Sequence, residues 1–364
     1  SAKGLTVSGA TTNSKTYNGD SVATVNFTLA GLAGVINPDV VILVSSGYSA
    51  TFNNKNVGTV KTVTVLGLTL DGADAGNYSL TQPVLNDGVI TQRTLVVTAT
   101  GTTKVYDSTT NATGFVTLSD NRIPLDGLTL THTAAFETKD VDNDKPVHVT
   151  GISITGGADA LNYTLNGVTT AETTADITPA TLAATITAND KIYDGNDSAT
   201  ITGRTPVGVI GSDEIILTGG TATFADANVG TGKVVSAIGI THTGVDALNY
   251  SYDGAATGDA DITPLGITGS FTADNKIYDG TKTADVLTQS LVGVLPLDIG
   301  NVVLTGGTAE FADPNVDNDI VVTEIVAMTL TGSVAGNYEL MSVANTEADI
   351  TQAPLTITAE NKSK

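Results

Sequence analysis

The sequence predicts an all-β fold made of four tandem β-sandwich modules in an elongated rod. Three observations predict it. Four short motifs recur in a constant order along the 364 residues, with a period near 87 residues. Polar and apolar residues alternate over short segments, as in half-buried strands, and apolar residues nowhere recur at helical spacing over three turns. A unit of this size can close its own hydrophobic core, so we expect serial domains rather than a stacked solenoid.

The recurrent motifs divide the chain into copies. The lysines of a Lys-x-Tyr-Asn/Asp-Gly/Ser motif are Lys15, Lys104, Lys191 and Lys276, which lie 89, 87 and 85 residues apart. The asparagines of an Asn-Tyr motif are Asn77, Asn162, Asn249 and Asn337. A phenylalanine precedes a valine by five residues at Phe52, Phe136, Phe224 and Phe311, and an Ile-Thr pair recurs at Ile90, Ile177, Ile262 and Ile350. These markers place copy one at 1–91, copy two at 92–178, copy three at 179–263 and copy four at 264–351. Residues 352–364 are expected to form the first strand of a further copy, so the chain reads as a segment of a longer array.

Copy three shows the expected strands most clearly. They cover residues 185–188, 198–202, 215–217, 221–224, 234–240, a segment from 250, and 260–263. Turn residues separate them, including Asn189-Asp190, Gly211-Ser212-Asp213 and Gly219-Gly220. About seven short strands at a spacing of 8–12 residues are typical of a β-sandwich.

The segment before each Asn-Tyr favours an immunoglobulin-like sandwich. Asp-Ala-x-Asn-Tyr occurs at 74–78, 159–163 and 246–250, and copy four has Val334 in place of the aspartate. Immunoglobulin-like sandwiches often carry a tyrosine corner, in which a tyrosine at the start of a strand bonds back to a nearby backbone group. Eight of the 10 tyrosines lie in the two tyrosine motifs. Only Tyr48 and Tyr252 remain outside them, so few aromatic side chains are left for a ligand platform.

The composition excludes several classes of function. The chain has 16 Lys+Arg against 38 Asp+Glu, a net charge of −22. Nucleic-acid binding and docking to anionic lipid both need clustered positive charge, so we expect neither. Because there is no cysteine, disulfides, thiolate metal sites and cysteine nucleophiles are impossible. No run of 18 apolar residues is present, so no membrane insertion by this segment is expected.

Three runs of the sequence resemble a known repeat. Residues 275–281 (Asn-Lys-Ile-Tyr-Asp-Gly-Thr), 224–233 and 74–78 are similar to the YDG repeat of large bacterial surface and secreted proteins, including filamentous-haemagglutinin-like adhesins. The resemblance covers all four copies. Copy one departs from it with Tyr17-Asn18-Gly19 and copy two with Tyr106-Asp107-Ser108. It implies an extracellular bacterial stalk module, with no defined ligand and no catalytic residue set.

Calcium is the one cofactor that the sequence suggests, and none is required. Copies two and four carry acidic residues on a turn at Asp140, Asp142, Asp144, Asp313, Asp317 and Asp319. Alternating carboxylates can converge on a hard cation, which takes six to eight oxygen ligands, but the glycine and the final glutamate of an EF-hand are missing. The alternative is an acidic, solvated hairpin turn that discourages edge-to-edge pairing.

Two further chemistries have a structural alternative in this sequence. A Lys–Asn isopeptide bond could staple each copy, since each has one recurrent lysine and one recurrent asparagine, but it needs a neutral lysine beside a buried acid. The alternative is a salt bridge from the lysine to the aspartate of Tyr-Asp-Gly and a turn-capping asparagine. His132, His148 and His242 belong to no catalytic motif, so we expect no enzyme and no catalytic or cofactor-binding residues.

We therefore expect a structural stalk segment of a bacterial cell-surface or secreted adhesin, which extends a distal domain and serves cell adhesion and biofilm formation. The alternative is a repeat array that itself binds a glycan, a matrix or a neighbouring strand, stabilised by calcium. The expected partners are other repeats of the same long chain and a host or matrix surface. Prolines at the junctions 177–182, 262–265 and 350–355 favour stiff linkers, whereas Gln92-Arg93-Thr94 lacks proline and is expected to bend more. Four modules of about 35–40 Å give a rod on the order of 150 Å.

Overall fold

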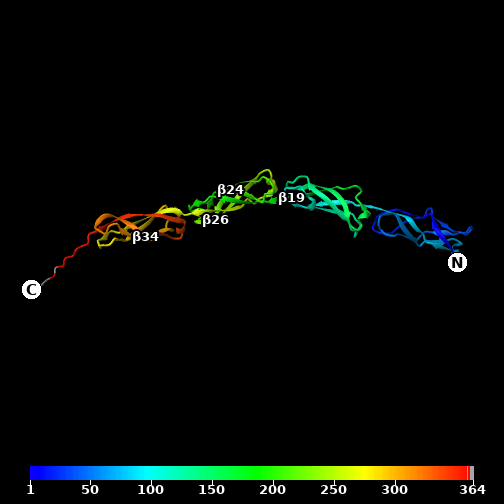
Figure 1. The fold of residues 1–364 in the computed structure, drawn as a ribbon, viewed down its shortest axis with the longest axis horizontal. Helices are drawn as coiled ribbons and strands as arrows, with labels where there is room; N and C mark the ends of the chain where they lie inside the picture. Colours follow the sequence, from blue (N-terminus) through cyan, green and yellow to red (C-terminus); the bar gives the residue numbers. More distant parts are fainter. Residues whose placement is uncertain (359, 361–364) are drawn as a thin grey trace. The chain divides into compact units, whose positions relative to one another are not determined.

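The computed structural model describes residues 1–358 and 360, and strands dominate them (Figure 1). In this part of the chain the helical segments are three-residue 3₁₀ turns such as Ala75–Asn77 and Ala160–Asn162, and there is no α-helix. No helix among the described residues is long and apolar enough to cross a membrane. The predicted all-β class is therefore confirmed. The chain divides into two compact units, Ser1–Ala180 and Thr181–Lys364.

The first unit contains nineteen complete strands. They are β1 (Lys3–Ser8), β2 (Thr11–Thr12), β3 (Lys15–Thr16), β4 (Val25–Asn26), β5 (Gly31–Ala33), β6 (Ile42–Val44), β7 (Ser49–Phe52), β8 (Gly58–Leu66), β9 (Thr69–Asp71), β10 (Tyr78–Thr81), β11 (Val84–Thr91), β12 (Arg93–Thr94), β13 (Val97–Gly101), β14 (Lys104–Val105), β15 (Val116–Asp120), β16 (Thr129–Phe136), β17 (Asp142–Gly156), β18 (Tyr163–Thr164) and β19 (Ala171–Thr178). Two four-stranded sheets share one order, β3-β11-β8-β7 and β14-β19-β17-β16. Smaller sheets accompany each of them, β10-β1-β5 and β6-β9 in copy one, and β13-β15 and β12-β18 in copy two.

The described part of the second unit contains sixteen strands after β20 (Ala180–Thr181). They are β21 (Ala183–Ala188), β22 (Lys191–Ile192), β23 (Ser198–Ala199), β24 (Ile201–Val207), β25 (Ile216–Phe224), β26 (Gly230–Thr243), β27 (Tyr250–Ser251), β28 (Ala256–Thr263), β29 (Leu265–Ala273), β30 (Lys276–Ile277), β31 (Thr283–Ala284), β32 (Val286–Val292), β33 (Val303–Phe311), β34 (Asp317–Thr331), β35 (Tyr338–Ala344) and β36 (Thr346–Thr351). Copy three forms one seven-stranded sheet, and copy four forms β30-β36-β34-β33-β31 and β32-β29-β35.

The sequence markers occupy the same register in every copy. In each copy, the strand that begins at the motif lysine pairs in parallel with the strand that ends at the Ile-Thr marker. The pairs are Lys15–Ile90, Lys104–Ile177, Lys191–Ile262 and Lys276–Ile350. The central hairpin pairs Phe52–Val63, Phe136–Val147, Phe224–Val235 and Phe311–Val322. The motifs therefore fix one strand frame, which is used four times.

The expected strands of copy three are present, with two differences. Residues 198–202 are divided between β23, which pairs with β25, and β24, which pairs with β21. Residues 216–217 and 221–224 belong to a single strand, β25, because Gly219 and Gly220 stay in the hairpin at φ +73° and +85°. Glycine adopts positive φ without steric cost, and a Cβ on Gly220 would lie 2.6 Å from the Ile240 side chain. A glycine pair that reads as a turn is here an irregularity inside a strand.

The further strand expected over 352–364 is not formed at residues 352–358 and 360, which pair with no other strand. Residues 359 and 361–364 lie outside the described residues. In copies one, two and four the first strand pairs in parallel with the strand that begins at the Asn-Tyr tyrosine of its own copy. The sequence contains no fifth Asn-Tyr pair that could provide such a partner for residues 352–358.

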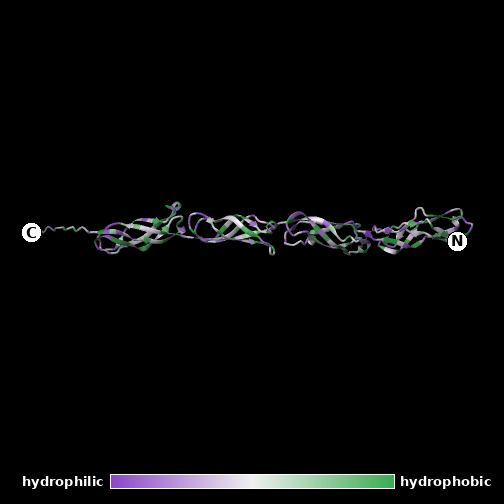
Figure 2. Cartoon of the chain, turned by 90° about the horizontal axis from the view of Figure 1, so that it is seen from above, coloured by the Kyte–Doolittle hydropathy of each residue, from purple (hydrophilic) through white to green (hydrophobic). Residues whose placement is uncertain are grey.

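The core consists of small and β-branched residues with one phenylalanine per hairpin. Figure 2 shows hydrophobic residues along the strands and hydrophilic ones at the loops. Phe52, Val63 and Ile90 are at most 4% exposed. In the first unit their cluster continues through Tyr17 to Leu95 and Tyr163 of copy two. The hydrophobic core of copy one is therefore completed by side chains of its neighbour.

Each recurrent lysine ties its strand to the following loop. Lys104 Nζ lies 2.7 Å from Asp107 Oδ1, donates to the carbonyl oxygens of Thr109 (2.8 Å) and Asn111 (2.9 Å), and lies 5.8 Å from the centre of the Phe136 ring. Lysines 191 and 276 form the same salt bridge to the motif aspartate. In copy one, Lys15 bonds Asn18 and pairs with Asp20. The salt-bridge interpretation of this lysine is therefore confirmed.

We predict that Lys104→Met destabilises copy two by about 2–3 kcal/mol, because it removes a buried ammonium group that donates to two backbone carbonyl oxygens and pairs with Asp107. The matched control is Lys276→Met, which removes the same contacts around a side chain that is 17% exposed rather than 1%. The measurement is urea unfolding followed by hydrogen exchange resolved to each copy. An equal loss in both variants would contradict the assignment of a buried tie at Lys104.

Candidate functional site: the joints between copies

A tyrosine corner stands at the start of each copy's Asn-Tyr strand. In copy two the hydroxyl of Tyr163 accepts the N–H of Ile123 at 2.8 Å and donates to Asp126 Oδ2 at 2.7 Å. The same pair of bonds joins Tyr78 to Ile36 and Asp39, Tyr250 to Ile210 and Asp213, and Tyr338 to Leu295 and Asp298. The tyrosine corner expected from the sequence is therefore present, with an additional aspartate as its acceptor.

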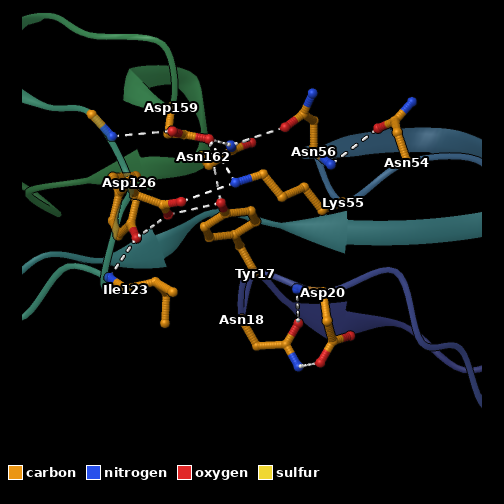
Figure 3. Close-up of polar contacts among 12 residues, drawn as sticks. Tyr17, Asn18, Asp20, Asn54, Lys55, Asn56, Ile123, Asp126, Asp159 and Asn162 are labelled. Atoms are coloured by element: carbon orange, nitrogen blue, oxygen red, sulfur yellow. Dashed lines mark hydrogen bonds and ion pairs between the residues drawn. The ribbon is translucent and has the colours of Figure 1, made fainter.

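The tyrosine of the Lys-x-Tyr motif reaches the corner of the next copy. Tyr17 of copy one donates to Asp126 Oδ2 at 2.7 Å, and its ring meets that of Tyr163 edge to face at 5.4 Å (Figure 3). In the second unit, Tyr193 of copy three donates to Asp298 at 2.9 Å and its ring lies 5.5 Å from that of Tyr338. Each joint therefore buries one carboxylate between two phenols, one from each copy.

A second contact joins the hairpin loop of one copy to the asparagine of the next. Asn162 Oδ1 accepts the N–H of Val57 at 2.9 Å, and Asn162 Nδ2 donates to Asn56 Oδ1 at 3.1 Å (Figure 3). In the second joint, Asn337 makes the same two bonds to Val229 (2.9 Å) and Asn228 (3.0 Å). We call these two sets of contacts the first joint (copies one and two) and the second joint (copies three and four).

The glycine of the Tyr-Asn/Asp-Gly motif permits the close approach. Gly19 has φ +85°, and a Cβ there would lie 2.9 Å from Ile123 Cγ2 of the next copy. At Gly195 the corresponding distance to Leu297 Cδ2 is 2.6 Å. Gly280 in copy four has the same backbone conformation but nothing within 4 Å of its Cβ position. Gly19, Gly195 and Gly280 are therefore all turn glycines, and Gly19 and Gly195 also form part of the contact surface at the two joints.

Both joints favour neutral tyrosines, and the first joint favours an ionised Asp126. Burial, with the nearby Asp126 carboxylate, raises the pKa of Tyr163 to about 12. Burial and then Asp298 raise the pKa of Tyr338 to about 12. Burial acts to raise the pKa of Asp126, but hydrogen bonds from Tyr163, Lys55 and Tyr17 outweigh it and hold this pKa below its ordinary value.

The first junction is restrained although it lacks proline. Gln92 is the single residue between β11 and β12, and its Nε2 donates to the carbonyl oxygens of Leu161 (3.1 Å) and Tyr163 (3.0 Å). Directly after it, Arg93 and Thr94 pair in parallel with Tyr163 and Thr164. The linker of the first joint is therefore short and hydrogen-bonded to copy two, a restraint that its lack of proline did not reveal.

Three of the six acidic residues proposed as calcium ligands accept hydrogen bonds from nearby backbone amides. Asp142 and Asp317 accept the N–H of the next residue at 2.9 Å, and Asp313 accepts that of Asn315 at 2.8 Å. Among residues 1–358 and 360, no group of three His, Asp or Glu side chains is placed to hold a metal ion. The structure thus does not bring Asp140, Asp142 and Asp144, or Asp313, Asp317 and Asp319, together as a metal site.

A β-bulge accounts for this acidic pattern. Asp144 and Asp319 adopt φ +50° and +53°, where copy three has Gly232 at +58°. Aspartate tolerates this left-handed conformation better than most residues. The amides of Asp144 and Asp319 donate to Asp176 and Asp349, as that of Gly232 does to Asp261. The register shifts at these positions, as in a bulge.

The other candidate chemistries have separate environments. Lys104 bonds within its own loop and Asn162 bonds Val57 across the joint, so the two residues proposed for an isopeptide bond have different partners. His148 Nδ1 lies 2.7 Å from Glu172 on the exposed surface. His242 Nε2 lies 3.2 Å from the carbonyl oxygen of Ala247. Both contacts are local to one copy.

We predict that Tyr17→Phe and Tyr193→Phe each lower stability by about 1–3 kcal/mol, because each leaves a buried carboxylate with one donor fewer. The matched control is Tyr278→Phe, since this tyrosine of the same motif is 42% exposed and bonds no following copy among the described residues. Equilibrium urea unfolding measures all three variants. Loss of equal size in Tyr278→Phe would show that the hydroxyl acts within its own copy.

We predict a loss of stability in alkali between about pH 10 and pH 12. A folded-state pKa raised to about 12 for Tyr163 and Tyr338, against an ordinary value of 10.0, contributes stability that is complete below pH 10 and disappears as the pH rises through the folded value. Thermal unfolding across this range provides the measurement. In the variant Tyr163→Phe/Tyr338→Phe the unfolding temperature should fall less steeply with pH over this range. A fall as steep as in the native chain would refute the assignment to these two residues.

Comparison with known proteins identifies the repeat. A model of the YDG domain matches residues 1–84, 91–174, 178–258 and 263–348. No curated protein matches the chain. Among solved structures, the crystal structure of Dscam1 isoform 6.9, N-terminal four Ig domains, has 9% sequence identity and covers 97% of this chain and 100% of its own, with a TM-score of 0.17 that supports no argument about architecture. Because the four matches cover most of its length, the chain belongs to the YDG domain family and carries four copies of that domain.

Proposed function

We propose that the chain is a structural stalk segment of a bacterial cell-surface or secreted adhesin. In this proposal four immunoglobulin-like β-sandwich modules form an elongated rod that holds a distal functional domain away from the cell. One observation carries the proposal: the motif side chains that define the repeat are used for contacts between consecutive copies. Tyr17, Val57 and Asn162 meet at the first joint, and Tyr193, Val229 and Asn337 meet at the second.

Two separate contacts at each joint favour a fixed orientation between copies. The phenol–carboxylate contact at Asp126 and the amide contact at Asn162 come from different loops, so a hinge motion must break at least one of them. Asp126 is 8% and Asn162 2% exposed. Opening the joint would leave these buried polar groups without their partners, which costs about 1–3 kcal/mol for each group. Stiffness is what a spacer requires.

The aromatic residues favour a spacer over a repeated binding surface. A sugar- or peptide-binding array would keep an exposed aromatic patch in every copy. Tyr48 bonds the backbone of Val25 and packs on Phe27, and Tyr252 bonds the carbonyl oxygen of Ala255. These two tyrosines lie outside the motifs and do not recur. The net charge of −22 suits a crowded, mutually repelling surface layer, and the proposal requires neither calcium nor catalysis.

Small-angle X-ray scattering of the whole chain tests the proposal. A rod on the order of 150 Å has a radius of gyration of about 43 Å, whereas a compact protein of this length has one of about 21 Å. We expect the value for the rod. A variant with both joints weakened, Tyr17→Ala/Tyr193→Ala, should lower it by allowing bends, while the matched control Tyr278→Ala should not. A native value near 21 Å would overturn the stalk proposal.

A further inference from the structure

One side chain differs between two otherwise equivalent joints. At the first joint, Lys55 Nζ lies 2.9 Å from Asp126 Oδ1 and 3.0 Å from Asp159 Oδ1, so one cation of copy one bridges two carboxylates of copy two (Figure 3). It also lies 5.7 Å from the centre of the Tyr17 ring. The side chains of Asp126 and Asp159 are only 3% and 13% exposed, so their charges are poorly screened by water.

The second joint lacks both the lysine and one of the carboxylates. Three residues after the hairpin phenylalanine, copy three has Ala227 where copy one has Lys55. Four residues before the Asn-Tyr tyrosine, copy four has Val334 where copy two has Asp159. No lysine or arginine in the described part of the chain lies within ion-pair distance of Asp298, which is 2% exposed and accepts from two tyrosines. The two replacements occur at the same joint.

We propose that this residue pair determines which YDG copies can follow one another. A copy with lysine at the position of Lys55 accepts a following copy with aspartate at the position of Asp159. A copy with alanine there accepts a following copy with valine. In sequence order, Lys139 of copy two precedes Asp246 of copy three in the same two positions.

The preference for one following copy over another comes mainly from one unfavourable combination, alanine at the position of Lys55 with aspartate at the position of Asp159. Without Lys55, Asp126 and Asp159 would face each other in a buried joint with no cation between them, and such unpaired charges are strongly unfavourable. The reverse mismatch, lysine with valine, keeps one ion pair and is milder. Specificity of this kind depends on rejecting the wrong neighbour as much as on attracting the right one.

The amide hydrogens of Val57 and Val229 report on the two joints separately. Each donates across its joint to an asparagine, at 2.9 Å in both cases, so its exchange with solvent follows the opening of that joint. The amide of Asn53 donates to Thr62 within copy one at 2.9 Å and reports unfolding of the copy itself. Exchange measured by NMR on the full chain therefore distinguishes a weakened joint from a damaged fold.

The test is a pair of reciprocal exchanges. We expect Lys55→Ala to accelerate exchange at Val57 by about tenfold, with Asn53 unchanged, and Lys55→Ala/Asp159→Val to restore it to within about threefold of the native rate. At the second joint, Val334→Asp should accelerate exchange at Val229 to a similar extent, and Ala227→Lys/Val334→Asp should restore it. In each case the amide of the unaltered joint is an internal control.

The proposal is overturned if the double variants exchange as fast as the singles, or if Lys55→Ala and Val334→Asp leave both valine amides unchanged. This inference rests on the proposed stalk function, because the order of the copies matters only if the array is held in line. The two proposals can nevertheless fail separately. A compact scattering profile, together with exchange rates that the double variants restore, rejects the stalk. An extended profile, together with double variants that exchange as fast as the singles, rejects this inference.

Discussion

A carboxylate buried between two tyrosine hydroxyls joins copy one to copy two at Asp126, and another joins copy three to copy four at Asp298. An ionised group removed from water is costly unless hydrogen bonds or a counter-charge compensate it. The tyrosine of its own corner supplies one donor. The tyrosine of the preceding copy supplies the other, so the corner of one domain is completed by its neighbour.

The remaining contacts of the joint follow from this arrangement. Tyr17 can reach Asp126 because Gly19, two residues later, turns with positive φ and has no Cβ to collide with Ile123. Lys15, two residues earlier, is fixed to its own loop, which holds the tyrosine strand in place. The residues of the short Lys-x-Tyr-Asn/Asp-Gly motif thus make contacts both within their own copy and with the next one. Its lysine stabilises the copy, whereas its tyrosine and glycine form the surface that meets the next copy.

Much of the strand frame could be predicted from the sequence, because it depends on local alternation and on repetition. The lysine's salt bridge was also predictable, since Asp107 lies only three residues from Lys104. The joint was not predicted. Tyr17 and Asp126 are 109 residues apart, and an aspartate in a turn looks like any other surface residue until a neighbouring domain buries it. Tyr17 and Tyr193 belong to a motif that marks a single copy in the sequence, and in the structure each donates to an aspartate of the following copy.

One signal for the joint was nevertheless present in the sequence. An Ile/Leu-x-x-Asp pattern ends at Asp39, Asp126, Asp213 and Asp298, spaced 87, 87 and 85 residues apart, and so forms a fifth marker with the period of the other four. The acidic triads, by contrast, suggested metal ligands from the spacing of their carboxylates. That spacing does not reveal the backbone conformation, which determines where the carboxylates point. At Asp144 and Asp319 the aspartate replaces a bulge glycine, a role that depends on a positive φ.

The most direct test of the account is the alignment of copies one and two, measured by residual dipolar couplings on the native chain. If the buried carboxylate and its two phenols hold the joint, the amide couplings of residues 3–91 and 93–178 fit one common alignment tensor. The account predicts this single tensor, and its loss on replacing Tyr17 with alanine. Two tensors of different magnitude or orientation in the native chain would contradict it, because they would mean that the copies move independently.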